Sequence, residues 1–350
     1  MRCLKRVTIS PLALMLAVAG ASAQQPQATA TGEPQIREWQ VPYPESRPRD
    51  PYVGPDGRVW FVGQRSHYVG VFDPQSGEFE KYDLEDGTGP HNLIVDRDGT
   101  IYYTGNLARH IGVLDPHSGK IEKIMMPDSA ARDPHTLVWD RDGDIWFTVQ
   151  GGNFVGHLDT ATRDVRLVQA PTVEGTRRGN SSRPYGIVVD SQDRPWIALF
   201  NTNLIARVDP GTYKLWTYEL PDGARPRRLV IDSNDAIWYV DYARGYLGRL
   251  DPASGEVDEW PSPGGPDSRP YGMAIDQYDR VWYVETGLEP NRFVGFETRR
   301  REFIGAVDIP SGAGAVRHMD YDPETSAVWF ATDANTLGRA VLPAPGDTDS

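Results

Sequence analysis

The sequence has almost no cysteine and only one long apolar run. The single cysteine, Cys3, precedes the run "PLALMLAVAG", and three basic residues, Arg2, Lys5 and Arg6, lie in the same short segment. This order is typical of a secretory signal peptide over residues 1–23, with cleavage expected after Ala23. The exported chain would then contain no thiol, which excludes disulfides, thiolate metal sites and cysteine nucleophiles.

Positive charge is also scarce. Lys and Arg number 36 against 49 Asp and Glu, and the formal net charge is −13 at pH 7. Such a chain is repelled by nucleic acid and by anionic membranes, so we expect neither as a partner. The apolar run near the start is too short to span a bilayer as a permanent helix, and no other run approaches its length, so we expect no membrane anchor. We expect a periplasmic or secreted monomer that binds a small molecule or a cyclic peptide.

Turn residues are abundant, and they separate many short apolar segments. The 35 glycines and 29 prolines favour an all-β protein. An aromatic residue within a strand-like segment recurs with gaps of 42, 44, 50, 42, 44 and 47 residues. Each unit contains four short strand segments, so seven units predict a seven-bladed β-propeller. We expect the tryptophans of this series to pack between blades. The seven positions are Trp60, Tyr102, Trp146, Trp196, Trp238, Trp282 and Trp329.

The two ends of the chain predict how the ring closes. Residues 36–42, "IREWQVP", resemble the outer fourth strand of a unit, and the last unit lacks such a strand. The N-terminal strand is therefore expected to complete the C-terminal blade. This assigns residues 36–342 to the propeller, with flexible segments at 24–35 and 343–350.

One position in each unit lies 11 residues before the aromatic and begins the innermost strand. The chain then turns and returns, so a residue 14 positions later should face it across the hairpin. Both sets are expected to gather at one mouth of the central channel. The first set is Arg49, His91, His135, Tyr185, Arg227, Tyr271 and His318. The second set is Gly63, Gly105, Val149, Leu199, Asp241, Glu285 and Thr332.

Titratable groups that converge in a concave site are the default prediction for a binding site. The structural alternative is that these residues cap the channel and bond to neighbouring blades. We expect Arg227 and Asp241 to form an ion pair. A carboxylate such as Glu285, opposite Tyr271, could hold a cation.

Two "DRDG" segments resemble the start of a calcium-binding loop. They lie at Asp96–Gly99 and Asp140–Gly143, and neither is followed by the glutamate that such a loop requires. We interpret both as tight turns between strands.

The repeated motif also resembles a known family. It is found here as "RPYGIVVDSQDRPWIALFNTNLIARVDP" and "RPYGMAIDQYDRVWYVETG". These segments, and the repeat over about residues 36–342, are similar to the streptogramin B lyases, also called virginiamycin B lyases. The resemblance implies a seven-bladed propeller that opens the ester of a cyclic depsipeptide by elimination, assisted by a divalent cation such as Mg²⁺.

The resemblance also implies roles for individual residues. Histidines at the inner-strand heads of the last two blades would carry the chemistry, with glutamates nearby. His318 would be the general acid and base of the last blade, while Tyr271 replaces histidine in the preceding one. Val316 occupies the position of a family glutamate, which leaves Glu285 and Asp241 as metal ligands, with His91 or His135 as further candidates. Independently of the resemblance, their predicted place at the mouth makes five residues the expected substrate contacts, namely His91, His135, Tyr185, Arg49 and Arg227.

Two other functions agree with the same features. One is a periplasmic module that binds a ligand at the mouth without catalysis. The other is a metal-dependent lactone hydrolase of the gluconolactonase type, which is an analogy of fold.

Overall fold

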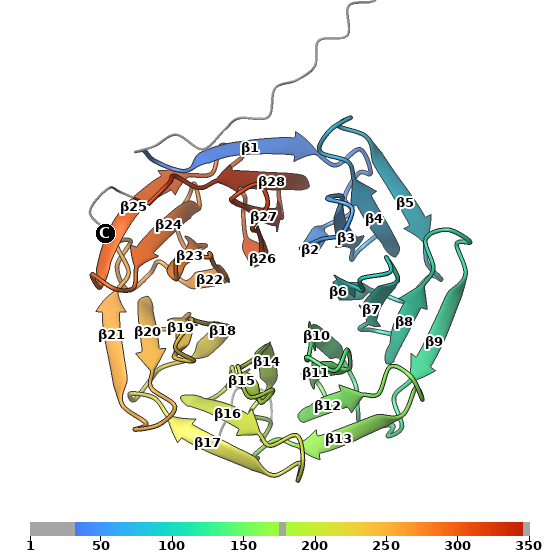
Figure 1. The fold of residues 1–350 in the computed structure, drawn as a ribbon, viewed down its shortest axis with the longest axis horizontal. Coiled ribbons are helices and arrows are strands. Elements are labelled where there is room, and N and C mark those ends of the chain that lie inside the picture. Colours follow the sequence, from blue (N-terminus) through green and yellow to red (C-terminus); the bar gives the residue numbers. More distant parts are fainter. Residues whose placement is uncertain (1–31, 175–179, 346–350) are drawn as a thin grey trace, which may run out of the picture.

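The structure, a computed structural model, describes residues 32–174 and 180–345. Within these ranges the chain forms 28 strands in seven four-stranded sheets, arranged as blades around a central axis (Figure 1). The predicted all-β, seven-bladed propeller is therefore confirmed. The predicted signal peptide lies outside the described residues. No helix in the described ranges is long and apolar enough to cross a membrane.

The strands of each blade follow one another from the centre of the ring to its rim (Figure 1). The innermost strands are β2 (Pro48–Val53), β6 (Pro90–Val95), β10 (Pro134–Trp139), β14 (Pro184–Val189), β18 (Pro226–Ile231), β22 (Pro270–Ile275) and β26 (Val316–Asp322). The second strands are β3 (Val59–Gly63), β7 (Ile101–Gly105), β11 (Ile145–Val149), β15 (Pro195–Leu199), β19 (Ile237–Asp241), β23 (Arg280–Glu285) and β27 (Ala327–Thr332). The third strands are β4 (Tyr68–Phe72), β8 (His110–Leu114), β12 (Phe154–Leu158), β16 (Leu204–Val208), β20 (Tyr246–Leu250), β24 (Arg292–Glu297) and β28 (Thr336–Val341). The outer strands are β5 (Phe79–Asp83), β9 (Ile121–Met125), β13 (Val165–Gln169), β17 (Leu215–Glu219), β21 (Val257–Pro261), β25 (Glu302–Asp308) and β1 (Gln35–Gln40).

The N-terminal strand closes the ring. β1 pairs antiparallel with β28, from Gln35 opposite Val341 to Gln40 opposite Thr336. It thereby supplies the fourth strand of the last blade, as the sequence predicts (Figure 1). Trp39 of β1 stacks on Trp329 of β27 with ring centroids 5.6 Å apart. The first and last parts of the chain therefore share one sheet and one apolar cluster.

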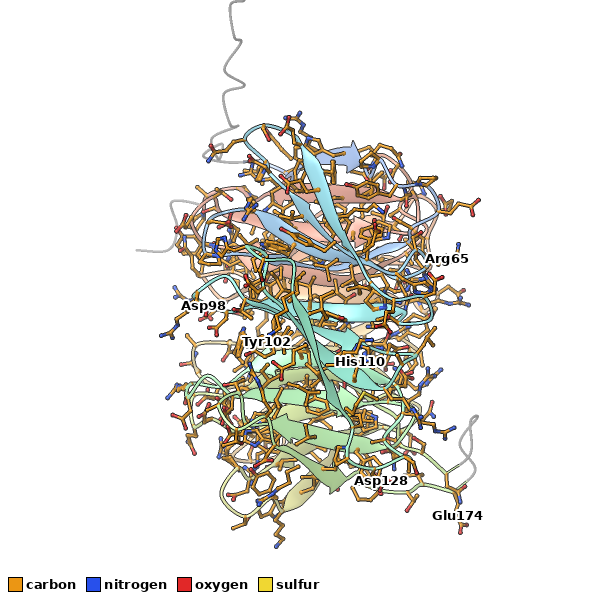
Figure 2. All side chains as sticks on the ribbon, turned by 90° about the vertical axis from the view of Figure 1, so that its right-hand side faces the viewer. Arg65, Asp98, Tyr102, His110, Asp128 and Glu174 are labelled. Carbon is orange, nitrogen blue, oxygen red and sulfur yellow. The ribbon has the colours of Figure 1, made fainter. Side chains whose placement is uncertain are left out.

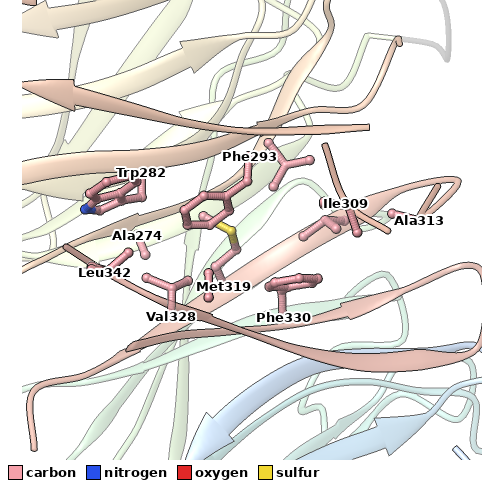
Figure 3. Close-up of a cluster of buried hydrophobic side chains, with 12 residues drawn as sticks. Ala274, Trp282, Phe293, Ile309, Ala313, Met319, Val328, Phe330 and Leu342 are labelled. Atoms are coloured by element: carbon pink, nitrogen blue, oxygen red, sulfur yellow. The ribbon is translucent and has the colours of Figure 1, made fainter. Parts of the chain in front are cut away.

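The core lies between neighbouring blades. The second strands are covered on both faces, so every residue of "VWFVG" in β3 is buried, whereas the outer strand β5 has exposed positions. The tryptophans of the repeat are at most 2% exposed, which agrees with their predicted packing role. Figure 3 shows one such cluster, in which Trp282 and Phe293 of one blade meet Met319 and Phe330 of the next.

The disc has two distinct faces. We call the side where the innermost strands begin the head face, and the side where the inner hairpins turn the turn face. Figure 2 shows the disc edge-on, with Arg65 in the turn after β3 towards one face and Asp98 in a hairpin turn towards the other. This distinction decides which predicted site residues can meet.

Candidate active site

A cavity of about 490 Å³ opens on the head face at the centre of the ring. Its size is within the range of small-molecule sites. Among the described residues, six arginines line it, together with histidines, tyrosines, amide side chains and one carboxylate. The lining residues are Arg47, Arg49, Gln64, His91, Asn106, Asp133, His135, Gln150, Arg183, Tyr185, Phe200, Asn201, Arg225, Arg227, Tyr242, Tyr271 and Arg317.

A β-bulge aims the heads of the inner strands into the channel. In β18, Pro226 pairs with Asp241 and Leu229 pairs with Tyr239, and the register shifts between these two pairs. The bulge falls in the same part of the inner strand in all seven blades. Bulges of this kind re-aim side chains next to functional sites. Six predicted mouth residues therefore line the head-face cavity, namely Arg49, His91, His135, Tyr185, Arg227 and Tyr271.

The placement predicted for His318 is wrong. In the last blade Met319 pairs with Phe330, whereas in the third blade Leu137 pairs with Phe147, so the last hairpin is one residue longer. Counting 11 residues back from Trp329 therefore gives His318, although the equivalent position in the last blade is Arg317. Arg317 is the residue at the head of β26 that lines the head-face cavity.

His318 lines a second cavity of about 430 Å³, which is formed by the later residues of the inner strands. Burial and the charge of Arg228 lower the pKa of His318 to about 4, and Asp50 opposes this only in part. Its Nδ1 atom is buried without a hydrogen-bond partner among the described residues. His318 is therefore neutral at physiological pH and lies apart from the head-face residues.

The placement predicted for Asp241 and Glu285 is also wrong. Asp241 pairs across its hairpin with Pro226, the residue before Arg227, and Glu285 pairs with Pro270. Neither carboxylate therefore lines the cavity. Asp241 is fully buried and bonded to Arg244 at 2.5 Å, and no ion pair with Arg227 forms. Glu285 is fully buried too. It accepts bonds from Arg292 at 2.6 Å, Ser262 at 2.7 Å and the amide of Gly264 at 2.6 Å.

A layer of polar side chains separates the two cavities. Arg228, one residue beyond Arg227, reaches across the channel to Asp50 Oδ2 at 3.1 Å and to Thr136 Oγ1 at 3.1 Å. It also donates to the carbonyl of Arg317 at 2.9 Å. Burial alone would raise the pKa of Asp50, but Arg228 and other neighbours hold it below its ordinary value. Arg228 and Thr136 line the second cavity, whereas Arg227, the neighbour of Arg228, lines the head-face cavity, so the layer lies between the two.

Two tyrosines and an arginine form the centre of the cavity. The Tyr185 and Tyr271 hydroxyl groups are hydrogen-bonded to each other. The Arg227 guanidinium lies over the Tyr271 ring, 3.4 Å from its centroid, and 4.2 Å from that of Tyr242. Cation–π contact of this kind stabilises a guanidinium that has no carboxylate partner. Phe200 completes this aromatic cluster.

The two phenols differ in acidity. Burial alone would raise the pKa of Tyr185, but Arg227, Arg228 and Arg49 outweigh burial and lower it to about 7. Burial raises the pKa of Tyr271 to about 12, and Arg227 opposes this only in part. Groups whose environments push their pKa values apart are candidates for the acid and the base of a reaction.

The histidines of the cavity are neutral. His91 and His135 have ring centroids 3.6 Å apart, and His135 lies 4.2 Å from the Tyr185 ring. Burial and the nearby arginines lower the pKa of both imidazoles well below their usual value. His135 Nδ1 is 2.8 Å from Thr136 Oγ1. These rings therefore form a packed, uncharged wall beside Tyr185.

Four of the cavity's arginines were not predicted from the sequence, although a signal was present. Arg47, Arg183 and Arg225 directly precede the proline that begins an inner strand, so "RP" marks them in the sequence. Arg47 and Arg183 have φ of 52° and 61°, which is uncommon for residues other than glycine. Strained backbone of this kind clusters at functional sites. Arg317, the fourth, was hidden by the longer hairpin.

The cavity that His318 lines is also lined by Asp320, a carboxyl group with an unusually high pKa. Burial raises the pKa of Asp320 to about 7, although its Oδ2 accepts a hydrogen bond from Val53 N at 2.8 Å. A raised folded-state pKa gives stability that is present below the unfolded pKa of about 4 and is lost as pH rises to about 7. Asp320→Asn is therefore expected to gain stability relative to the native protein across this window, by up to roughly 4 kcal/mol.

Urea unfolding of both proteins at several pH values measures this difference. Asp98→Asn, at an exposed carboxylate of the turn face, is the matched control and should show no such trend. A difference between Asp320→Asn and the native protein that is constant from pH 4 to pH 8 would contradict the assignment.

The family model described as the virginiamycin B lyase family matches residues 22–175 and 171–344. The chain belongs to this family. No curated protein sequence matches the chain. The resemblance found in the repeat is thus confirmed, and so is the fold that it implies.

Solved virginiamycin B lyases are similar in structure. The selenomethionine-substituted enzyme from Staphylococcus aureus has a TM-score of 0.78 and 22% sequence identity, and covers 89% of this chain and 100% of its own. A streptogramin B lyase has a TM-score of 0.78 and 25% identity, covering 89% and 99%. A catalytically inactive histidine variant of the S. aureus enzyme with quinupristin has a TM-score of 0.78 and 22% identity, covering 89% and 100%.

The head-face cavity of this virginiamycin B lyase family member does not fit a divalent cation. Mg²⁺ prefers carboxylate, carbonyl and water oxygens. The cavity offers one carboxylate, Asp133, which accepts a hydrogen bond from Asn106, against six guanidinium groups. Residue Ala315, two positions before Arg317 in the corrected register, provides no carboxylate either. Six positive charges around the cavity would repel a cation.

Another group of residues could hold a metal ion. Ligand atoms of Asp140, Asp144 and His157 lie within 4.8 Å of one another. Asp140 also caps its hairpin, accepting from the amides of Asp142 and Asp144 at 3.1 and 2.8 Å, so the "DRDG" segment is a turn as predicted. Asp144, directly after the "DRDG" segment, and His157, from β12, are the members that no sequence motif indicated. The group lies outside the head-face cavity.

Proposed function

We propose that this protein is a carbon–oxygen lyase whose active site is the head-face cavity. The observation that carries the proposal is the hydrogen-bonded pair Tyr185–Tyr271 beneath the guanidinium of Arg227. Family membership supports an elimination, and the unequal acidity of the two phenols supports their different roles. We propose further that the protein acts after export, on a small molecule or a cyclic peptide.

The elimination needs a base, an acid and a source of positive charge. The Tyr185 phenolate removes a proton from the carbon next to a carbonyl group, and the electron pair of that C–H bond forms a carbon–carbon double bond. The C–O bond on the adjacent carbon breaks, and its oxygen leaves with the bonding pair. Tyr271 donates a proton to this oxygen. Proton transfer through the Tyr185–Tyr271 hydrogen bond then restores both groups, so no water is consumed.

Arginine supplies the electrostatic part of this mechanism. Negative charge develops on the carbonyl oxygen as the proton leaves, and fixed cations aimed at developing charge lower the barrier. Arg227 and Arg49 both lower the pKa of Tyr185, so their charges already act on this centre. The resemblance to the streptogramin B lyases implies a divalent cation for this step. Because the residues of this cavity do not fit one, we assign no step to a metal and propose that the guanidinium groups stabilise the charge.

Product analysis tests the proposal. The protein is incubated with a panel of β-acyloxy and β-alkoxy carbonyl compounds that includes a streptogramin B, with and without EDTA. We expect products with a new carbon–carbon double bond and no added water, in equal yield under both conditions. A gain of one water would indicate a hydrolase instead. If no member of the panel is converted, the cavity is a binding site without this chemistry.

A further inference from the structure

The cavity presents hydrogen-bond donors that have no acceptor. Nε and Nη2 of Arg49, Nε of Arg227 and Nε2 of Gln150 are buried without a hydrogen-bond partner among the described residues. Arg49 is 5% exposed, and all three side chains line the cavity. Buried donors are costly unless they are satisfied, so such a set indicates a ligand rich in acceptor oxygens.

The described carboxylates near the cavity are fewer than the arginines that they could neutralise. Asp333 pairs with Arg317 at 2.5 Å and with Arg47 at 3.5 Å, so one carboxylate serves two arginines. Asp50 serves Arg228 at 3.1 Å and lies 3.7 Å from Arg49. Arg227 has no ion pair with a described carboxylate and is held by aromatic rings instead.

We propose that the substrate is a carboxylic acid with an oxygen substituent on its β-carbon, of the kind that a 4-linked uronic acid residue presents. This inference rests on the proposed function and names its substrate class. Arg49 and Arg227 bind the carboxylate, because a guanidinium matches a carboxylate through paired N–H bonds. Neutralising the carboxylate also acidifies the neighbouring C–H bond, which is the bond that Tyr185 must break.

The remaining walls of the cavity suit a sugar ring. Four aromatic residues line the cavity, and the C–H face of a pyranose can pack against aromatic rings. These are Tyr185, Phe200, Tyr242 and Tyr271. Four amide side chains supply donors and acceptors for hydroxyl groups. These are Gln64, Asn106, Gln150 and Asn201. A cavity of about 490 Å³ accommodates one or two sugar units.

The step balances without a further reactant. In a 4-linked uronide the proton on C5 is next to the carboxylate carbon, and O4 is the substituent on the adjacent carbon. Tyr185 takes the C5 proton, the C4–O4 bond breaks, and Tyr271 protonates O4. The products are an unsaturated uronide and a shortened chain with a free hydroxyl.

Binding and turnover are tested separately. Isothermal titration of the inactive Tyr185→Phe protein with trigalacturonate, with its methyl ester and with inorganic phosphate measures which anion chemistry is recognised. We expect the acid to bind at least about tenfold more tightly than the ester, because the ester lacks the charge. We expect the acid to bind more tightly than inorganic phosphate as well. Added salt should weaken binding of the acid.

Variants locate the anion. Arg227→Met and Arg49→Gln, made in the Tyr185→Phe background, should each lower affinity for the acid about tenfold or more. Arg97→Met is the matched control, because Arg97 is an exposed arginine outside the head-face cavity. Equal binding of acid and ester, or tighter binding of inorganic phosphate, would overturn the substrate class. Binding of the acid without unsaturated product from the native protein would instead overturn the proposed elimination.

Discussion

Replacing Tyr185 by phenylalanine is expected to lower kcat/KM for elimination by about 10³-fold. The substitution keeps the ring that packs on His135 and Phe200 and removes only the hydroxyl group. General acid–base groups contribute rate factors of this order. The substrate should still bind, because the arginines remain. Steady-state measurement of the unsaturated product gives the result directly.

The pH dependence sharpens this prediction. The base is the phenolate, so kcat/KM of the native protein should rise as pH increases through about 7 and then level off. Tyr185→Phe should lose both the rate and this rise. Tyr82→Phe is the control, since that hydroxyl donates a hydrogen bond to Pro116 O at 3.0 Å, and Tyr82 does not line the cavity. A Tyr185→Phe protein that kept a tenth of the native activity would exclude the phenol as the base.

Arg228→Met is expected to lower the free energy of unfolding by about 3–5 kcal/mol, the range for a buried ion pair that loses one partner. Arg228 is 3% exposed and joins β18 to Asp50 of β2 on the opposite side of the channel. Without it, the Asp50 carboxylate remains buried and loses its closest cation. Urea unfolding at neutral pH measures the loss.

A second substitution distinguishes lost charge balance from lost packing. In Asp50→Asn with Arg228→Met, no uncompensated carboxylate remains, so we expect the double variant to recover most of the stability. A double variant that is less stable than either single variant would contradict this account. A loss below 1 kcal/mol in the free energy of unfolding of Arg228→Met would also contradict it. The ion pair between Arg228 and Asp50 would then contribute little to the stability of the layer between the cavities.

The fold was predictable because it depends on a repeated pattern. Each blade buries its second strand on both faces, which requires the same apolar run and the same aromatic residue in every unit. The ring closure was predictable for a similar reason, since an unpaired outer strand at the start matches a missing one at the end. Trp39 and Trp329 meet because both follow this pattern.

The site was predictable only in part. Counting back from the aromatic residue found six cavity residues, because six hairpins have one length. The seventh hairpin is one residue longer, so the count gave His318 in place of Arg317. A fixed count of 11 residues back from the aromatic residue assumes that all hairpins have the same length, so it cannot detect the extra residue.

The carboxylates were misplaced for a different reason. The prediction assumed a regular hairpin, in which Arg227 would lie opposite Asp241. The bulge in the inner strand shifts the register by one residue, so that Pro226 lies opposite Asp241 instead. Asp241 and Glu285 therefore lie behind the prolines and bond to Arg244 and Arg292. The positive charge of the cavity also exceeded expectation, because the spacing placed only Arg49 and Arg227 at the mouth and four further arginines line the cavity.

The most direct test of the central claim is an ultraviolet titration of tyrosine ionisation in the native protein and in Tyr185→Phe. The account predicts a tyrosinate signal that appears as pH rises through about 7 in the native protein and is absent from the variant. It also predicts that an oxygen-rich acid bound in the cavity shifts this signal to higher pH, because added negative charge opposes ionisation. If the native protein and the variant give the same titration curve, with no ionisation below about pH 9, Tyr185 is not the base.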